Sequence, residues 1–236
     1  MRTRFQRSNL FGPWRLALLP LLLILLTVAC TATAVPATTP TALPVENTLF
    51  TATITSPAPT PYSPINLPLT AYILDDNTGQ RSSQRTAEQL QGIYEKVNAI
   101  YAPAGITVDL QAVHRVQLPP AYLTAVSNGD FEHFFSGINR DFTLPDPSLL
   151  NAFYASDIGG PNGITPFRTR TFFVTDFPSV HHERVTSHEI GHILGLHHVL
   201  DDPGRLMFSG TNGMTLSEEE ITVARYAAQG LLDGLR

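Results

Sequence analysis

The sequence predicts an α+β domain, in which a twisted, mixed β-sheet is backed by helices and one helix carries a group of histidines. Strand-like stretches, with apolar side chains at every second residue or runs of β-branched and aromatic residues, are interleaved with stretches whose apolar residues recur three and four apart. The chain has 236 residues, of which 43% are hydrophobic, and this suffices for one globular domain with appendages.

The amino end predicts an export signal. Four arginines and no acids lie in the first fifteen residues, and an apolar run then continues to Ala29. The run is shorter than the ~20 residues that a membrane-spanning helix requires. Residues 27–30 (Thr-Val-Ala-Cys) resemble a bacterial lipobox, so we expect a signal peptide over 1–29 and a lipidated Cys30 that anchors the exported protein to the outer side of a bilayer. The alternative is plain cleavage after Ala34, which would release a soluble secreted protein.

The next segment has the composition of a linker. Residues 30–68 are rich in Thr, Pro, Ala and Ser and cannot bury enough apolar surface to offset the entropy of ordering. We expect a disordered tether there and a folded domain over 69–236. The net charge of −5, without a basic patch in the mature part, argues against nucleic acid as a partner, and we expect a monomer.

Six elements are expected in the first part of the domain. In chain order they are a strand at 69–74, a helix at 84–101, a strand at 106–112, a short helix near 131–138, and strands at 149–154 and 171–174. Ser83 is the expected N-cap of the long helix and Pro103 its end. Residues 156–163 have the composition of a loop.

Two further helices complete the domain. The first is expected over 183–194 and carries the histidines. The second begins at Ser217, because Ser217 and Glu220 form the S-x-x-E pattern of a capping box, with acids at the positive end of the helix dipole.

Residues 188–198 read H-E-x-x-H-x-x-G-x-x-H. His188 and His192 are four apart, so on a helix they lie on one face and can aim two imidazoles at a single point. Gly195 lacks a Cβ and allows the chain to turn, which would return His198 as a third nitrogen. Choosing His197 instead would break the spacing. Three neutral imidazoles and an open fourth position are what one catalytic zinc ion requires.

This motif, together with Met207, resembles the metzincin clan of zinc endopeptidases, and the short run from His198 to Leu206-Met207 is most similar to the matrixin branch. The resemblance implies a zinc peptidase that acts on proteins or peptides. It implies an upper subdomain over 69–195 and a small helical lower subdomain over 196–236. It also implies a turn at Met207 beneath the imidazoles.

The resemblance also implies how a substrate would lie. Such enzymes pair an extended substrate with an edge strand of the upper sheet, for which residues 151–156 are the best candidate. The segment 208–213 would form the wall beyond the zinc. Glu189 would act as general base for the attacking water and then as general acid for the leaving amine.

Other interpretations of the same residues stay open. In a gluzincin the third ligand would be a glutamate, and residues 218–220 offer three. The zinc site could instead belong to a lipid-tethered binding module without catalysis, or serve only to hold the fold. Asp157, Asp201 and Asp202 could bind calcium through carboxylate oxygens, but no recognisable loop spacing supports this.

Overall fold

The computed structural model describes residues 62–234 and the strand at 46–49. The expected signal peptide and Cys30 lie outside the described residues. In chain order the elements are β1 (Glu46–Leu49), β2 (Ile65–Asp76), α1 (Ala87–Tyr101), the 3₁₀-helix η1 (Ala102–Ala104), β3 (Ile106–Leu118), α2 (Pro120–Ser127), α3 (Phe131–Phe142), β4 (Leu150–Ala155), β5 (Gly163–Ile164), β6 (Thr171–Thr175), α4 (His182–Ile193) and α5 (Glu218–Leu232).

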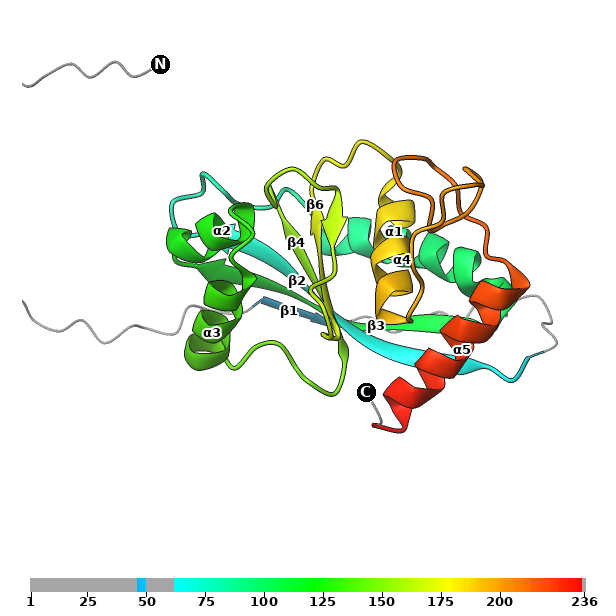
Figure 1. Ribbon diagram of the computed structural model, residues 1–236. Helices are drawn as coiled ribbons and strands as arrows, with labels where there is room; N and C mark the ends of the chain where they lie inside the picture. The colour runs from blue at the N-terminus through cyan, green and yellow to red at the C-terminus, as the bar shows by residue number, and fades with distance from the viewer. Residues whose placement is uncertain (1–45, 50–61, 235–236) are drawn as a thin grey trace, which may run out of the picture. The chain divides into compact units, whose positions relative to one another are not determined.

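The strands form one mixed sheet in the order β1-β3-β2-β4-β6-β5 (Figure 1). Strands β3, β2, β4 and β6 are parallel, whereas β1 and β5 run antiparallel to their neighbours β3 and β6. The expectation that residues 151–156 form an edge strand is therefore wrong, because β4 lies between β2 and β6. The edge on that side is the two-residue strand β5, which is defined by its pairing with β6. Two residues are too few to show an alternation of apolar and polar side chains in the sequence.

The start of the folded domain also differs from the expected boundary at 68/69. Strand β2 begins at Ile65, and both Ile65 and Leu67 are buried while Asn66 between them is exposed. The period-two alternation thus extends into the segment that composition assigned to the tether. Strand β1 lies in that segment as well and pairs with β3. A short strand contributes too few residues to change the composition of a window rich in Thr and Pro.

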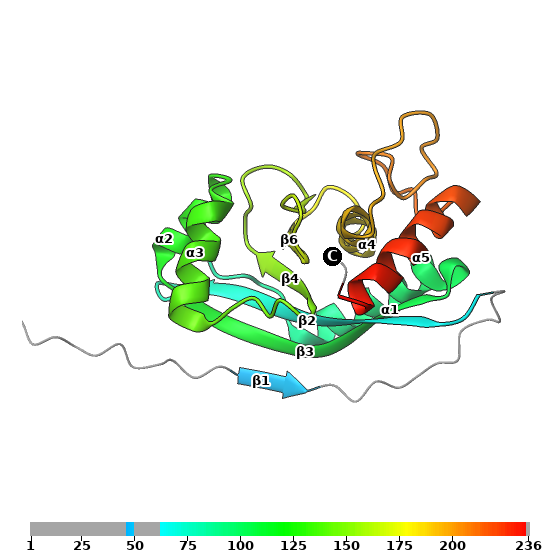
Figure 2. The ribbon, with the colours of Figure 1, turned by 60° about the horizontal axis from the view of Figure 1, so that its bottom comes forward.

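Helices cover both faces of the sheet. One face packs against α1, α4 and α5 and the other against α2 and α3, as the two views in Figures 1 and 2 show. The α+β class and the mixed sheet backed by helices are confirmed. No helix within residues 62–234 is both long and apolar enough to cross a bilayer.

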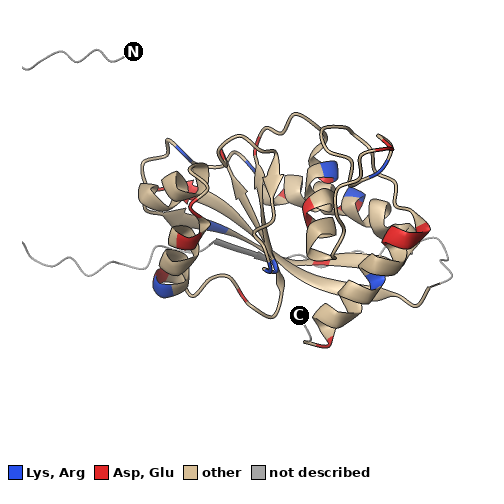
Figure 3. Cartoon of the chain, in the orientation of Figure 1, with Lys and Arg blue, Asp and Glu red and all other residues tan. Residues whose placement is uncertain are grey.

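Local capping interactions set where two of the helices begin. At α5, Ser217 Oγ accepts from the Glu220 N–H and the Glu220 side chain accepts from the Ser217 N–H, which confirms the expected capping box. The acidic first turn of α5 is visible in Figure 3. At α1 the capping box is Thr86 with Gln89, and the expected cap, Ser83, lies outside the helix.

The residues after Gly195 share a core with the rest of the domain. Leu206 and Met207, and Ile221 and Ala224 of α5, belong to the same buried cluster as β2 and α1. The expected lower subdomain is therefore a layer on the same core rather than a separately packed unit. Helix α2 was not expected, although Pro120 at its first position is a common helix-start signal.

Candidate metal centre

Helix α4 and the turn that follows it bring three histidines together. His188 and His192 lie one turn apart on α4, and Gly195, at φ +80°, reverses the chain so that His198 faces them. One ring nitrogen from each of the three lies within 4.8 Å of the others, and His188 Nε2 is 3.0 Å from His198 Nε2. These three histidines could hold a metal ion. His197 is exposed and is not part of this group.

The second nitrogen of two of the rings is held by a backbone carbonyl. His188 Nδ1 lies 2.8 Å from the Leu206 oxygen, and His192 Nδ1 lies 3.0 Å from the Leu196 oxygen. A carbonyl can only accept, so in each ring Nδ1 carries the proton and Nε2 presents a lone pair.

This donor set fits zinc. Two nitrogen ligands at ~2.0–2.1 Å on a tetrahedral ion are about 3.3 Å apart, close to the separation seen between His188 and His198. Burial lowers the pKa of His188 to about 4 and also lowers that of His192, because a charged imidazolium is poorly solvated there. Both rings are therefore neutral at neutral pH, the form that binds a metal.

Glu189 is buried beside the first histidine, with 5% of its surface exposed. Its Oε2 accepts a hydrogen bond of 2.9 Å from the Thr165 hydroxyl. Burial raises the pKa of Glu189 to about 7, and the Thr165 bond and the Arg184 charge act in the opposite direction. A cation held by the neighbouring imidazoles would further favour the carboxylate.

Two residues that pattern reasoning missed position this carboxylate. Thr165 follows the edge strand β5, and its Oγ1 also lies 3.0 Å from the Glu189 backbone oxygen. A Cβ on Gly163 of β5 would lie 2.7 Å from both Cγ and Oε1 of Glu189, so only glycine allows this approach. No sequence signal connects either residue with a glutamate more than twenty positions away.

Met207 packs against the underside of α4. It is fully buried, and a Cβ on Gly191 would lie only 2.7 Å from its Sδ. The Val199 N–H donates to the Met207 oxygen at 3.1 Å, so the segment around Met207 is tied to the residue after His198. Asp157 and Asp202 are exposed and accept bonds from the nearby N–H groups of Gly159 and Gly204. Within residues 62–234 they form no further group of three ligands.

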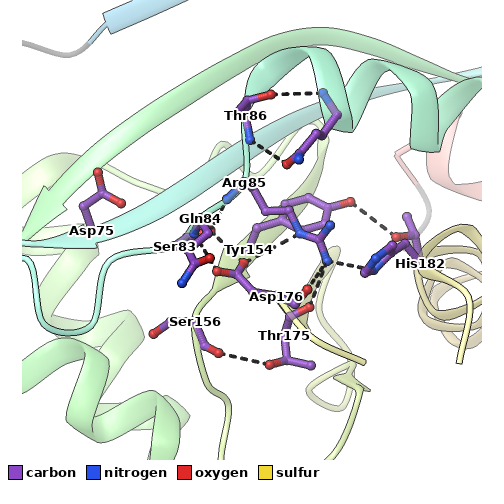
Figure 4. Close-up of polar contacts among 12 residues, drawn as sticks. Asp75, Ser83, Gln84, Arg85, Thr86, Tyr154, Ser156, Thr175, Asp176 and His182 are labelled. Carbon is purple, nitrogen blue, oxygen red and sulfur yellow. Dashed lines mark hydrogen bonds and ion pairs between the residues drawn. The ribbon is translucent and has the colours of Figure 1, made fainter. Parts of the chain in front are cut away.

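A buried arginine in the loop before α1 holds the start of α4. Arg85 Nη2 lies 2.8 Å from His182 Nδ1 and donates to the backbone oxygens of Asp176 and Thr175 (Figure 4). Asp176 in turn accepts from Ser83 Oγ at 2.8 Å. This network joins the loop before α1 to the loop between β6 and α4.

Among known proteins, the likeness of this chain is to solved structures and is distant. No family model and no curated protein matches the sequence. Among solved structures, the chain is similar to the crystal structure of metalloproteinase-II from Bacteroides fragilis, with 17% sequence identity and a TM-score of 0.48. The match covers 72% of this chain and 56% of that chain, so the protein spans little more than half the length of that structure. A function for this chain therefore has to rest on the geometry of its own residues.

Proposed function

We propose that this protein is a zinc-dependent endopeptidase of the metzincin type. The observation that carries the proposal is the convergence of His188, His192 and His198 on one point, with the buried carboxylate of Glu189 adjacent to the first of them. A structural zinc site is closed by a fourth protein ligand. Among the described residues only three ligands gather here, as a site that admits a substrate requires.

The proposed chemistry divides between the histidines and the glutamate. His188, His192 and His198 would hold the ion through nitrogen atoms whose lone pairs face the same point. When bound, zinc supplies Lewis-acid activation of a water molecule and of the scissile carbonyl. Glu189 takes the proton of the attacking water on a carboxylate oxygen and delivers it to the leaving amine nitrogen. The Thr165 hydroxyl keeps the carboxylate in one orientation during both transfers.

The substrate would bind beside β5. Among the described strands this one is the last in the sheet and pairs with β6 alone, so its outer edge has backbone groups available to an extended peptide. Gly163 of β5 is in van der Waals range of Glu189, so a peptide paired there would lie close to the proposed base. The segment 208–213 would form the opposite wall.

Metal content and hydrolysis test this function together. We expect the purified protein to contain one zinc per chain, and to cleave a proteome-derived peptide library at internal bonds. A chelator should stop cleavage and added zinc should restore it. Zinc at unit stoichiometry without cleavage of any peptide would favour the lipid-tethered, non-catalytic binding module. A protein that neither binds zinc nor cleaves would refute both.

The same proposal includes a location outside the cytoplasm, through lipidation of Cys30. The supporting observation is the order of residues near the amino end, where a basic stretch is followed by an apolar run and then by Cys30. Labelled palmitate should enter the expressed protein, and Cys30→Ala should shift it from the membrane fraction to the soluble one. Unchanged fractionation of the variant would leave the simple secretory signal as the better interpretation.

A further inference from the structure

Arg184 lies one helical turn before His188 on α4 and is 4% exposed. Its Nη2 donates to the Leu206 oxygen at 3.0 Å and makes a second, very short bond to the Phe208 oxygen. Within residues 62–234 no carboxylate lies within ion-pair distance of it. A buried cation is costly to desolvate, so these two carbonyls are its main compensation. The guanidinium therefore holds the 206–208 segment against α4.

One of these carbonyls also contacts the metal centre. The Leu206 oxygen that accepts from Arg184 also accepts from His188 Nδ1 at 2.8 Å. The position of this oxygen decides which nitrogen of His188 is protonated and how the ring is turned. Arg184 is therefore one hydrogen bond removed from the first histidine, although it does not touch it.

The same segment is connected to the third histidine. Val199, which directly follows His198, forms an isolated bridge with Phe208, and its N–H donates to the Met207 oxygen. Asn212, which follows this segment in the chain, accepts through its Oδ1 from the His181 N–H just before α4. In contrast, the His192 ring is oriented by the Leu196 backbone oxygen, which is not part of the 206–208 segment.

We propose that Arg184 is a positioning residue for the three-histidine cluster: by holding the 206–208 segment, it sets the tautomer and orientation of His188 and the place of His198. The role of the cluster in peptide hydrolysis rests on the proposed function. The effect of Arg184 on the imidazole rings does not rest on the proposed function, because the hydrogen bonds that carry it are present in the metal-free protein.

Arg85 offers a matched control. It is 6% exposed, donates to the backbone carbonyls of Thr175 and Asp176, and contacts α4 through His182. It makes no contact with the 206–208 segment. Replacing either arginine by methionine removes a buried cation and leaves carbonyls unpaired, so both changes should lower stability. Arg85→Met also removes the ion pair of Arg85 Nε with the buried Asp176 carboxylate, 3.6 Å away, so it is the more severe of the two changes. Arg85→Met should affect His182, whereas only the Arg184 change should affect His188 and His198.

The first test observes the ring nitrogens of metal-free protein by ¹⁵N NMR of labelled histidine. In the wild-type chain, His188 and His192 should both show a protonated Nδ1. In Arg184→Met, His188 should change to a mixture of tautomers while His192 keeps its signal. In Arg85→Met, both rings should remain as in the wild type. An unchanged His188 in folded Arg184→Met would overturn the proposal.

The second test measures the Kd for zinc by competition with a chromophoric chelator. Loss of a group that orients a ligand typically weakens metal binding by about 10–100-fold, which we expect for Arg184→Met and not for Arg85→Met. Arg184→Lys keeps the charge but not the fork that bonds two carbonyls, so it should fold and show a smaller loss. If Arg184→Met does not fold, Arg184→Lys becomes the test of the proposal. An Arg184→Lys protein with the wild-type Kd for zinc and the wild-type His188 tautomer would then reject it. Absence of zinc binding by the wild-type chain would refute the proposed function instead, and the NMR result would still decide the role of Arg184.

Discussion

Both faces of the sheet bury aromatic rings, but the two faces differ in the groups that accompany those rings. On the face covered by α2 and α3, Phe134 is fully buried and meets the rings of Phe153 and Phe173 edge to face, at centroid distances of 5.5 and 5.3 Å. On the face covered by α1 and α4, the core also contains buried polar groups, including Arg184 and Glu189.

This difference indicates that one face contributes mainly to the free energy of unfolding and the other to the proposed reaction. Aromatic burial contributes to the free energy of unfolding in proportion to the area removed from water. Buried charges cost desolvation energy and contribute little net stability, yet they hold the groups that the proposed reaction requires. Mutations on the face covered by α2 and α3 should therefore lower stability and leave the rate per folded molecule intact, whereas mutations of the buried groups that contact the histidine cluster or Glu189 should alter binding or rate.

The largest effect is expected for Glu189→Gln. Removing the proposed base should lower kcat by about 10²–10⁴-fold, the usual contribution of general acid–base catalysis. Zinc content should not change, since the amide has the shape of the carboxylate and the histidines are untouched. Glu183→Gln on the same helix is the control, because Glu183 pairs with the exposed Lys96 away from the cluster and should retain wild-type turnover. Near-native turnover by Glu189→Gln would remove the role given to this carboxylate.

Phe134→Ala tests the opposite face. Truncating this fully buried ring should lower the free energy of unfolding by about 3–5 kcal/mol, as a transfer and a cavity term combine. Urea denaturation measures the loss, and cleavage rates corrected for the folded fraction should match the wild type. A reduced corrected rate would show that the two faces are coupled, contrary to the comparison.

Gly191→Ala probes the contact between α4 and Met207. The new Cβ would lie 2.7 Å from the Met207 sulfur, so the thioether must move within a closely packed core. Overpacking of this kind costs about 1–3 kcal/mol of stability. Because Met207 lies in the segment that orients His188, we also expect weaker zinc binding in the chelator competition. Loss of stability with wild-type zinc affinity would limit Met207 to a packing role.

The smallest effect should have the opposite sign. Gly92 lies within α1, where a Cβ would meet nothing within 4 Å. Gly92→Ala should therefore stabilise the protein by up to about 1 kcal/mol through helix propensity, with activity unchanged. Thermal unfolding alongside Gly191→Ala compares two helical glycines that differ only in their surroundings. Destabilisation by Gly92→Ala would mean that the space beside α1 is filled in solution.

Interactions between residues close in sequence were the most predictable. The capping box of α5 needs only Ser217 and Glu220, three positions apart, and it was predicted correctly. The spacing of His188 and His192 fixes their common face in the same way. By contrast, Ser83 looked like a helix cap, but its hydroxyl bonds Asp176, 93 positions away, and Thr86 takes the cap. A local pattern cannot reveal that a side chain is already used by a distant partner.

The sequence by itself determined the histidine-bearing helix, the turn at Gly195 and the alternation of most strands, since each depends on neighbours within about one or two turns of chain. Only the tertiary structure decided that β5 rather than β4 is the edge strand, that Thr165 contacts Glu189, and that Arg184 and His188 share the Leu206 oxygen. The physical reason is that strand order and shared hydrogen bonds depend on which distant segments the folded core brings together, and no periodicity in the chain encodes that choice.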